Sequence, residues 1–427
     1  MAQSAGAAPT FKPDALYLKT LVLKAESSNL AEDRPWLKLV HYKPRWFGGW
    51  TSQVDSTNFF LDTSGKFDPA REMEETLAAF FSTGPLIKAL DTSMPENLGW
   101  TEEAQHAQCR FRARYLYLRD QLKWDEARLP PYPCENFEKF SAGLQARSAT
   151  LVFSSYFLNA PASAFGHTLL RINKDATAKS GKRFELLDQG INFAAVMTTQ
   201  NPVIYAVKGV FGFFRGTFTS VPYYFKVREY NDHEKRDLWE YDLNLTQSEM
   251  DLMVAHVWEL GPSYYDYYYL DENCSYHMLT ILEAAAPRLH LVDQLPSIVI
   301  PVDTVRALYN EKDFVTNIQF RPSVYRQFDT RLQRLSASDA RWLKKIVAAK
   351  DAGQVAGAPV EVLSDANKVD ILDTALDYID YEKSKELRDG DAGALAWKQN
   401  VLQARSAILK PSRELAPPYP KGDEPHA

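Results

Sequence analysis

A lone cysteine, Cys274, stands where a helix is expected to begin. It lies in the run Asp271-Glu272-Asn273-Cys274-Ser275-Tyr276-His277, which leads into an apolar segment that ends at Pro287. Asp, Asn and Ser cap helix N-termini, and proline ends a helix. The unpaired N–H groups and positive dipole end at a helix start favour the thiolate, the nucleophilic form of cysteine. The pattern predicts a thiol nucleophile; the alternative is a small buried residue that opens a core helix.

A histidine on a second element would supply the base. Gly166-His167 opens the apolar run 167–172, which is typical of a buried strand. An imidazole on a rigid element can deprotonate the thiol and later protonate the leaving group. We therefore predict that His167 is the base. His277 is the alternative, because it lies three residues after Cys274 on nearly the same helix face.

The imidazole needs an orienting partner that fixes its tautomer. If segments 167–172 and 183–189 form a hairpin centred near residues 177–178, Asp188 falls opposite His167. Asp188 is therefore the predicted third member, with Asn192 as the alternative. The interpretation depends on the register, because a shift of one residue turns Asp188 to the other face.

Attack of a thiolate on a carbonyl also needs hydrogen-bond donors for the oxyanion. The N–H groups of Cys274 and of the residues just after it are candidates. Side-chain donors and supporting residues are predicted at Ser155, Tyr156, Asn159, Asn192 and Asn273. In the glycine-spaced aromatic run 207–218, we expect an apolar, substrate-binding wall of Phe211, Phe213, Phe214 and Phe218, with Arg215 in its midst able to meet a phosphate. The alternative is an ordinary aromatic loop on the core.

Three short patterns together resemble one family. They are Asn159-x-Pro161-x-Ser163-x-Phe165-Gly166-His167-Thr168-Leu169-Leu170-Arg171-Ile172, then Asn192-Phe193-Ala194, then Asn273-Cys274-Ser275-Tyr276. This combination is similar to the Lnb-type bacterial lipoprotein N-acyltransferases, over roughly residues 30 to 290. The resemblance implies a circularly permuted papain-like (NlpC-related) thiol fold outside the cytoplasmic membrane. It also implies that Cys274 accepts the acyl group and that His167 is its base.

The implied reaction has three partners: a phospholipid or other glycerolipid donor, a diacylated bacterial lipoprotein and the membrane surface that holds both. A fatty acyl group would pass through a Cys274 thioester to the N-terminal amine of the lipoprotein's S-diacylglyceryl-cysteine. Two other functions stay open. One is a hydrolase on the same scaffold, acting as a cell-wall peptidase, an amidase or a lipid hydrolase. The other is a non-enzymatic envelope binding protein in which Cys274 is structural.

Charge and composition narrow the class of protein. The chain has 427 residues and a net charge of −6, which argues against a nucleic-acid binder. No stretch approaches the ~18 apolar residues of a spanning helix, and residues 1–9 lack the charged and apolar regions of a signal peptide. We interpret the start as that of a mature exported chain with an added Met1. The predicted location is periplasmic, peripheral on the envelope membrane.

The cysteines fit an oxidising compartment. Cys109 and Cys134 flank one helix-like segment, and pairing them closes a loop of ~25 residues, to which the loop-entropy model assigns about 3 kcal/mol. Cys274 is then the odd, reactive thiol. The alternative is three reduced cysteines. No CxxC pair or His/Cys spacing suggests zinc, and no cofactor is expected.

The predicted fold class is α+β, a thiol catalytic core between helical regions. We expect a disordered start at 1–13, a mostly helical region at 14–147, the catalytic domain at 148–290, a second helical region at 291–410 and a Pro-rich tail or surface strap at 411–427. Strands are predicted at 150–157, 167–172, 183–189 and 221–230. Helices are predicted after Asp68-Pro69, between the capping box at Thr246 and Gly261, and after Asn273. The aromatic turn 46–50 is predicted to pack on the surface, with a lid as the alternative.

Overall fold

The computed structural model describes residues 13–84, 87, 100, 103–155, 165–174, 185–199, 201–415, 419–420, 422 and 424–426. The chain divides into two compact units, which are treated separately below. The first comprises residues 1–151, 168–221 and 242–316, and the second comprises 152–167, 222–241 and 317–427. The disorder predicted for residues 1–13 concerns positions almost wholly outside the described residues.

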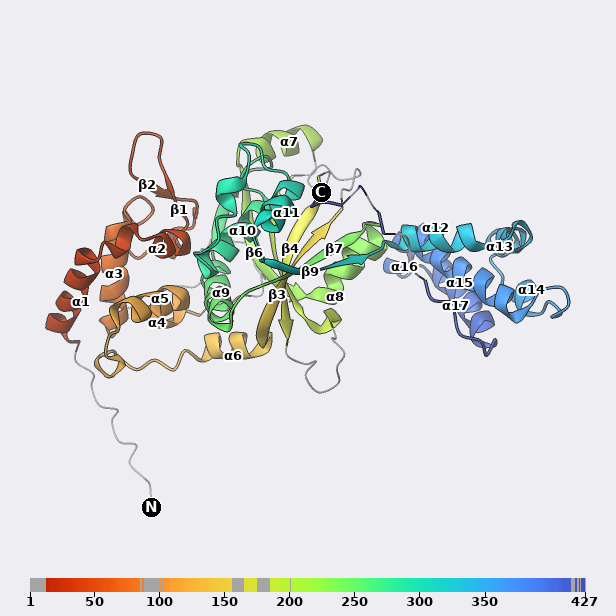
Figure 1. Ribbon diagram of the computed structural model, residues 1–427, viewed down its shortest axis with the longest axis horizontal. Helices are drawn as coiled ribbons and strands as arrows, with labels where there is room; N and C mark the ends of the chain where they lie inside the picture. The colour runs from red at the N-terminus through yellow and green to blue at the C-terminus, as the bar shows by residue number, and fades with distance from the viewer. Residues whose placement is uncertain are drawn as a thin grey trace, which may run out of the picture. The chain divides into compact units, whose positions relative to one another are not determined.

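The first unit begins with helices and one small hairpin, as predicted for this mostly helical region (Figure 1). The elements are α1 (Ala15–Ser27), α2 (Arg34–Leu39), β1 (Tyr42–Pro44), β2 (Trp50–Ser52), α3 (Pro69–Phe81), α4 (Ala107–Arg110), α5 (Arg112–Leu122) and α6 (Glu135–Leu144), with short turns η1 (Leu30–Glu32), η2 (Thr57–Phe59) and η3 (Glu126–Arg128). Asp68 caps α3 by accepting from the N–H groups of Ala70 and Arg71. The predicted disulfide between Cys109 and Cys134 is present.

A seven-stranded sheet follows, in the order β8-β6-β5-β4-β3-β7-β9. Its strands are β3 (Ala146–Ser154), β4 (His167–Lys174), β5 (Gln189–Val196), β6 (Phe214–Pro222), β7 (Leu238–Leu243), β8 (Tyr264–Tyr267) and β9 (Val315–Arg321). The pairs β4–β5 and β6–β8 are antiparallel. The structure is thus a mixed α and β fold with a large antiparallel sheet, which confirms the α+β class.

The strands predicted near residues 150 and 167 are confirmed as β3 and β4, but two strand predictions are wrong. Within 183–189, a short η5 turn (Glu185–Leu187) is closed by the Asp188 N–H donating to the Glu185 carbonyl, and strand β5 begins only at Gln189. Within 221–230, Pro222 ends β6, and the aromatic residues that follow form α8 (Tyr223–Val227) and the π-helical turn η6 (Arg228–His233). Aromatic residues favour strands only where a neighbouring strand can pair with them.

Two predicted helices carry the centre of the first unit. In α9 (Gln247–Leu260), Thr246 and Glu249 make both bonds of the capping box. In α10 (Cys274–Ala285), nearly every side chain is buried, and the His277 ring lies 4.3 Å from the Phe193 ring of β5, measured between centroids. This unit also contains α7 (Pro202–Val210), η7 (Val292–Gln294) and α11 (Pro301–Asn310).

The second unit contains a helical bundle (Figure 1). Its helices are α12 (Val324–Arg334), α13 (Ala337–Ala349), α14 (Gly353–Ala356), α15 (Asp365–Glu382), α16 (Ser384–Arg388) and α17 (Ala392–Ser406). Leu372 and Ile379 of α15 lie fully buried in its core. In the tail, the Tyr419 ring packs 5.2 Å from the Trp239 ring, and His426 hydrogen-bonds the Tyr241 hydroxyl. The described part of the tail therefore behaves as a strap, one of the two predicted alternatives.

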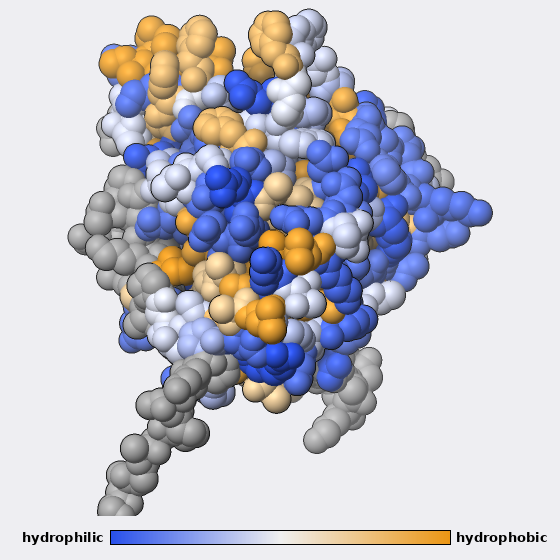
Figure 2. Space-filling view, turned by 90° about the vertical axis from the view of Figure 1, so that its left-hand side faces the viewer, coloured by the Kyte–Doolittle hydropathy of each residue, from blue (hydrophilic) through white to orange (hydrophobic). Residues whose placement is uncertain are grey.

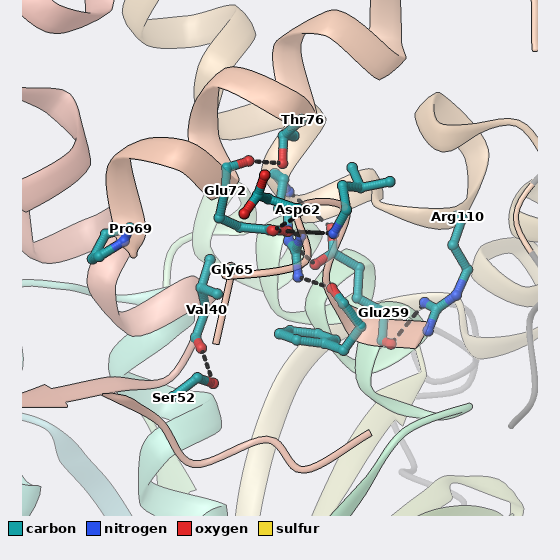
Figure 3. A network of polar contacts seen from close by, with 12 residues as sticks. Val40, Ser52, Asp62, Gly65, Pro69, Glu72, Thr76, Arg110 and Glu259 are labelled. Carbon is teal, nitrogen blue, oxygen red and sulfur yellow. Dashed lines mark hydrogen bonds and ion pairs between the residues drawn. The ribbon is translucent and has the colours of Figure 1, made fainter. Parts of the chain in front are cut away.

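Buried ion pairs fasten the N-terminal helices to α9 (Figure 3). The Arg114 guanidinium of α5 lies 2.6 Å from the Glu72 carboxylate of α3 and 3.6 Å from the Glu259 carboxylate of α9, and all three side chains are fully buried. Glu72 also accepts from the N–H groups of Leu61 and Asp62. Burial raises the pKa of Glu259 to about 7, and the charge of Arg114 is the largest effect that opposes this rise.

We expect Arg114→Leu to lower the free energy of unfolding by about 3–5 kcal/mol, because it leaves two carboxylates in the interior without their cation. Urea unfolding of the oxidised protein measures this loss. The matched control is Arg71→Leu, because Arg71 is largely exposed in its pair with Glu74 and should contribute under about 1 kcal/mol. Equal effects of the two substitutions would contradict the assignment.

Candidate active site

Asn273 caps the helix that begins with Cys274. Its side-chain oxygen accepts from the N–H groups of Ser275 and Tyr276, at 3.1 and 3.2 Å. Its amide nitrogen donates to the carbonyls of Tyr269 and Val299. Both amide hydrogens are used, so Asn273 supports the helix start and has none left for an oxyanion. The cap also occupies two of the N–H groups that the sequence offered as oxyanion donors.

Cys274 is buried, with 3% of its surface exposed. Four groups can donate hydrogen bonds to its sulfur. They are the N–H groups of Thr168, Ser275 and Cys274 itself, and the Tyr267 hydroxyl. The same hydroxyl lies 3.3 Å from the Cys274 nitrogen. The start of β4 and the end of β8 therefore meet at the thiol, and Thr168 is the residue directly after His167.

The prediction of a thiol whose pKa is lowered at rest is wrong. Burial raises the pKa of the Cys274 thiol, and this desolvation outweighs the hydrogen bonds from Thr168 and Tyr267 that lower it. The charge and hydrogen bond of Cys274 in turn add to the burial that raises the pKa of Tyr267. The thiol thus rests in its protonated form, and a reaction requires a base or a change in its surroundings.

His167 begins β4 and is held by its own unit. Its ring lies half-buried, 5.7 Å from the Tyr230 ring, and its carbonyl accepts from the Ser154 hydroxyl at 3.4 Å. The residue before it must be glycine for two reasons. Gly166 has φ +99°, and a Cβ there would lie 2.7 Å from the Phe153 ring and 2.8 Å from the Ser154 carbonyl. The glycine of the Gly-His pair is therefore required by the backbone.

The register predicted for the hairpin is wrong, so Asp188 does not lie in the position opposite His167 that this register implied. The observed pairs are Leu170 with Ile191, Arg171 with Gly190 and Ile172 with Gln189. Asp188 thus lies beyond the far end of the paired segment, where its carboxylate accepts from the Lys174 N–H at 2.9 Å and lies 3.6 Å from Arg171. The centre of the hairpin lies three residues further along than assumed, so each cross-strand partner is shifted by six residues, because the η5 turn delays the return strand.

Asn192, the alternative partner, lies nearer the start of β4. It follows Ile191, which pairs with Leu170, so Asn192 lies on the side of this pair toward Thr168, whereas Asp188 lies beyond the other end of the paired segment. The Asn192 side chain is buried.

The predicted side-chain donors at the end of β3 have different outcomes. Ser155 donates its N–H to the Asp237 carbonyl and accepts the Asp237 N–H at 3.1 Å, which is a local structural role. Tyr156 and Asn159 lie outside the described residues.

The aromatic run 207–218 divides into two parts. It contains the end of α7 and the start of β6, joined by a short turn. Phe214 and Phe218 are buried in the core, whereas Phe211 and Phe213 are 62% and 66% exposed. The Arg215 guanidinium stacks on the Tyr264 ring, 4.3 Å from its centroid. Of the predicted aromatic wall, Phe211 and Phe213 face solvent, and the exposed Val207 and Val210 lie in the same run.

Aromatic rings surround the His277 imidazole. Both ring nitrogens are buried without a hydrogen-bond partner, and the ring lies 4.3–4.4 Å from those of Phe193 and Tyr265. Burial lowers the pKa of His277 to about 3, so this imidazole stays neutral in a packed core. The arrangement favours His167 over His277 as the base.

Two further histidines lie in the interior of the same unit. The Nε2 atoms of His41 and His256 are 3.0 Å apart. Burial lowers the pKa of His256 to about 3, and Arg114 adds to this effect. Burial also depresses the pKa of His41, with contributions from His256, His277 and Lys38.

The lowered pKa values of His41, His256 and His277 predict that acid destabilises the folded protein. In the unfolded chain, His41, His256 and His277 take up protons near pH 6.5, whereas in the folded chain burial holds the pKa of each of them below this value, so stability falls as the pH drops below about 6.5. At pH about 5 each of the three histidines should cost about 2 kcal/mol. Urea unfolding across this range measures the slope, and His41→Gln with His256→Gln should flatten it. Stability that rises on acidification would contradict the assignment.

Tyr267 and Thr168 contact the thiol but were not among the predicted site residues. The only available signal for Tyr267 was the tyrosine-rich run 264–269 before the cysteine. Thr168 belongs to the histidine motif, but it contributes a backbone N–H, which no residue type reveals.

Family comparisons bear on this site directly. Residues 136–311 match the family model of the Lnb N-terminal periplasmic domain. This match supports Lnb-type family membership and covers both His167 and Cys274. Residues 28–121 and 318–417 match two domains of unknown function, DUF7843 and DUF7842. No curated protein and no solved structure matches the chain.

A lipoprotein-processing family of this kind suggests an enzyme, and a periplasmic domain fits a periplasmic location. Among the described residues, no helix has the length and apolar character needed to cross a bilayer. Within the same part of the chain, no cluster of three His, Cys, Asp or Glu side chains is arranged to hold a metal ion.

The raised thiol pKa predicts slow alkylation. With Cys109 and Cys134 bonded to each other, iodoacetamide reports Cys274 alone, and its rate should rise only in alkaline solution, above the range of an ordinary free cysteine. Tyr267→Phe removes a donor to the thiolate and should slow the reaction at neutral pH by about fivefold. Tyr268→Phe is the control. A half-maximal rate near neutral pH would contradict this account.

Proposed function

We propose that this protein is a lipoprotein N-acyltransferase that carries a fatty acyl group on Cys274. The observation that supports this most is the surroundings of the thiol. It lies at the N-terminus of α10, with the N–H groups of Thr168, Cys274 and Ser275 around the sulfur, inside the segment that matches the Lnb N-terminal periplasmic domain. Backbone N–H groups of this kind stabilise negative charge on a thiolate.

In the first step, the Cys274 proton passes to His167, and the thiolate attacks an ester carbonyl of a glycerolipid. The C–S bond forms, the ester C–O bond breaks, and the leaving alkoxide takes the proton from the imidazolium. In the second step, the amine of the S-diacylglyceryl-cysteine attacks the thioester. The C–N bond forms, the C–S bond breaks, and the amine proton returns through His167 to the thiolate.

The orienting partner of His167 in this proposal is Asn192, because Asp188 sits at the other end of β4. For the oxyanion, we assign the Cys274 N–H, which in the resting state faces the sulfur and lies 3.3 Å from the Tyr267 hydroxyl. The Ser275 and Tyr276 N–H groups serve the Asn273 cap instead.

Burial of the thiol suits a transferase better than a hydrolase. Water and the amine acceptor compete for the acyl carbon of a thioester. A site that excludes water therefore favours transfer to the amine over hydrolysis. The 3% exposure of Cys274 means that the donor lipid must displace protein atoms from the sulfur before reaction. We propose that the surrounding fold is a circularly permuted papain-like core, in which the histidine strand precedes the cysteine helix.

The proposed substrates are a phospholipid or other glycerolipid as donor and a diacylated bacterial lipoprotein as acceptor. Both carry acyl chains, so we place the protein on the periplasmic side of the envelope membrane as a peripheral protein.

The direct test incubates the purified protein with phospholipid vesicles and a synthetic diacylated lipopeptide, followed by mass spectrometry. We expect an added acyl group on the lipopeptide amine and, without lipopeptide, an acyl adduct on Cys274. Cys274→Ala should abolish both products, and His167→Ala should lower the rate by about 10²–10⁴-fold. The His277→Gln variant is the matched control and should keep substantial activity if it folds.

Other products would overturn the proposal. Release of free fatty acid without lipopeptide acylation would indicate a lipid hydrolase. Cleavage of muropeptides in a parallel digest would indicate a cell-wall peptidase or amidase. No product and no adduct on Cys274 would indicate a non-enzymatic binding protein.

A further inference from the structure

The tip of the β1–β2 hairpin presents two bare aromatic side chains. Trp46 and Phe47 are 94% and 97% exposed, contrary to the packed turn that the sequence suggested. Gly48 and Gly49 adopt φ +85° and +77°, and Arg45 exchanges backbone hydrogen bonds with this turn at 2.9–3.0 Å. The turn is thus closed by its backbone, and its aromatic side chains contribute nothing to a core.

Helix α7 and the residues after it form a second apolar surface in the same unit. Asn201 caps the helix by accepting from the N–H groups of Val203 and Ile204. Tyr205 faces inward, and the solvent-facing side is apolar. Its large apolar residues are each between 47% and 72% exposed: Val203, Ile204, Val207, Val210, Phe211 and Phe213. An exposed helix normally carries polar residues on its solvent face.

The hairpin tip and α7 project toward the same side of the unit (Figure 1, top). Figure 2 shows hydrophobic side chains gathered at the top of its view, which has the same vertical axis. We call these two elements together the docking surface.

Both parts of the docking surface are fastened to the loop that leads to the nucleophile. Lys43 of β1 forms an ion pair with Glu272, two residues before Cys274. On the other side, the Tyr269 N–H donates to the Gly209 carbonyl of α7 at 3.0 Å. A Cβ at Gly209 would lie 2.2 Å from the Tyr269 ring, and one at Gly212 would lie 2.3 Å from the Tyr268 ring. The close packing on both glycines holds α7 against loop 267–274.

The charge of these segments differs from that of the whole chain. Segments 42–50 and 201–215 contain Lys43, Arg45, Lys208 and Arg215 and no Asp or Glu, although the chain as a whole carries −6. Apolar and aromatic residues flanked by cations are the composition of a segment that lies in the interface of an anionic bilayer.

We propose that the docking surface binds the surface of a phospholipid bilayer. Trp46, Phe47 and the apolar side of α7 enter the interface, and loop 267–274 is brought against the lipid between them. The choice of a bilayer as occupant rests in part on the proposed function, since an acyl donor is supplied there. Binding itself requires no chemistry and is tested without it.

The experiment is flotation of the purified full chain with vesicles of phosphatidylethanolamine and phosphatidylglycerol, compared with vesicles of phosphatidylcholine alone. We expect the protein to float with the anionic vesicles, less so in high salt. Trp46→Ser with Phe47→Ser, and separately Val207→Ser with Phe211→Ser, should each weaken partitioning by about tenfold or more. Leu16→Ser with Leu23→Ser on α1 is the matched control, because these residues are also exposed.

Three outcomes overturn the proposal: no flotation of the wild type, unchanged flotation of both variants, or a stable dimer that the same substitutions dissociate. The last would identify a second copy as the occupant. Cys274→Ala should float like the wild type. Flotation without lipopeptide acylation would refute the proposed reaction and leave the docking surface standing, and acylation without flotation would do the reverse.

Discussion

The buried contact of Arg114 with Glu72 and Glu259 is the constraint on which the first unit depends. Each of the three charges would be costly in the interior alone, and each is tolerable only because helices α3, α5 and α9 all stay in place. Helix α9 packs on α10, which begins with the candidate nucleophile. The N-terminal helices are thus part of the support of the site, and a change far from Cys274 can displace it through α9.

At Cys274, two opposing effects leave a protonated thiol. Removal from water disfavours the thiolate, while the Thr168 N–H and the Tyr267 hydroxyl favour it. In the proposed reaction, such a sulfur would not react with the wrong partner while the site is at rest. Lys43 and α7 both hold the loop before Cys274, so binding at the proposed docking surface would act on the residues next to the thiol.

Much of this could be predicted from sequence where a local rule decides. The capping box at Thr246, the Asn273 cap and the Asp68-Pro69 start gave correct helices, and two flanking cysteines gave the disulfide. The errors arose where distant contacts decide. A short turn at Glu185–Leu187 moved the hairpin register by six residues, and burial reversed the expected shift of the Cys274 pKa. Trp46 and Phe47 are apolar yet unpacked, which no propensity can reveal.

The disulfide has a consequence for how the chain matures. An unfolded chain in an oxidising compartment holds three thiols, and two of their three pairings would trap Cys274 in a wrong bridge. The native pair spans 25 residues, several times fewer than either competitor, which favours its closure by on the order of 1–2 kcal/mol. Early closure followed by burial of the third sulfur at the start of α10 would let the chain oxidise correctly while keeping one thiol reduced.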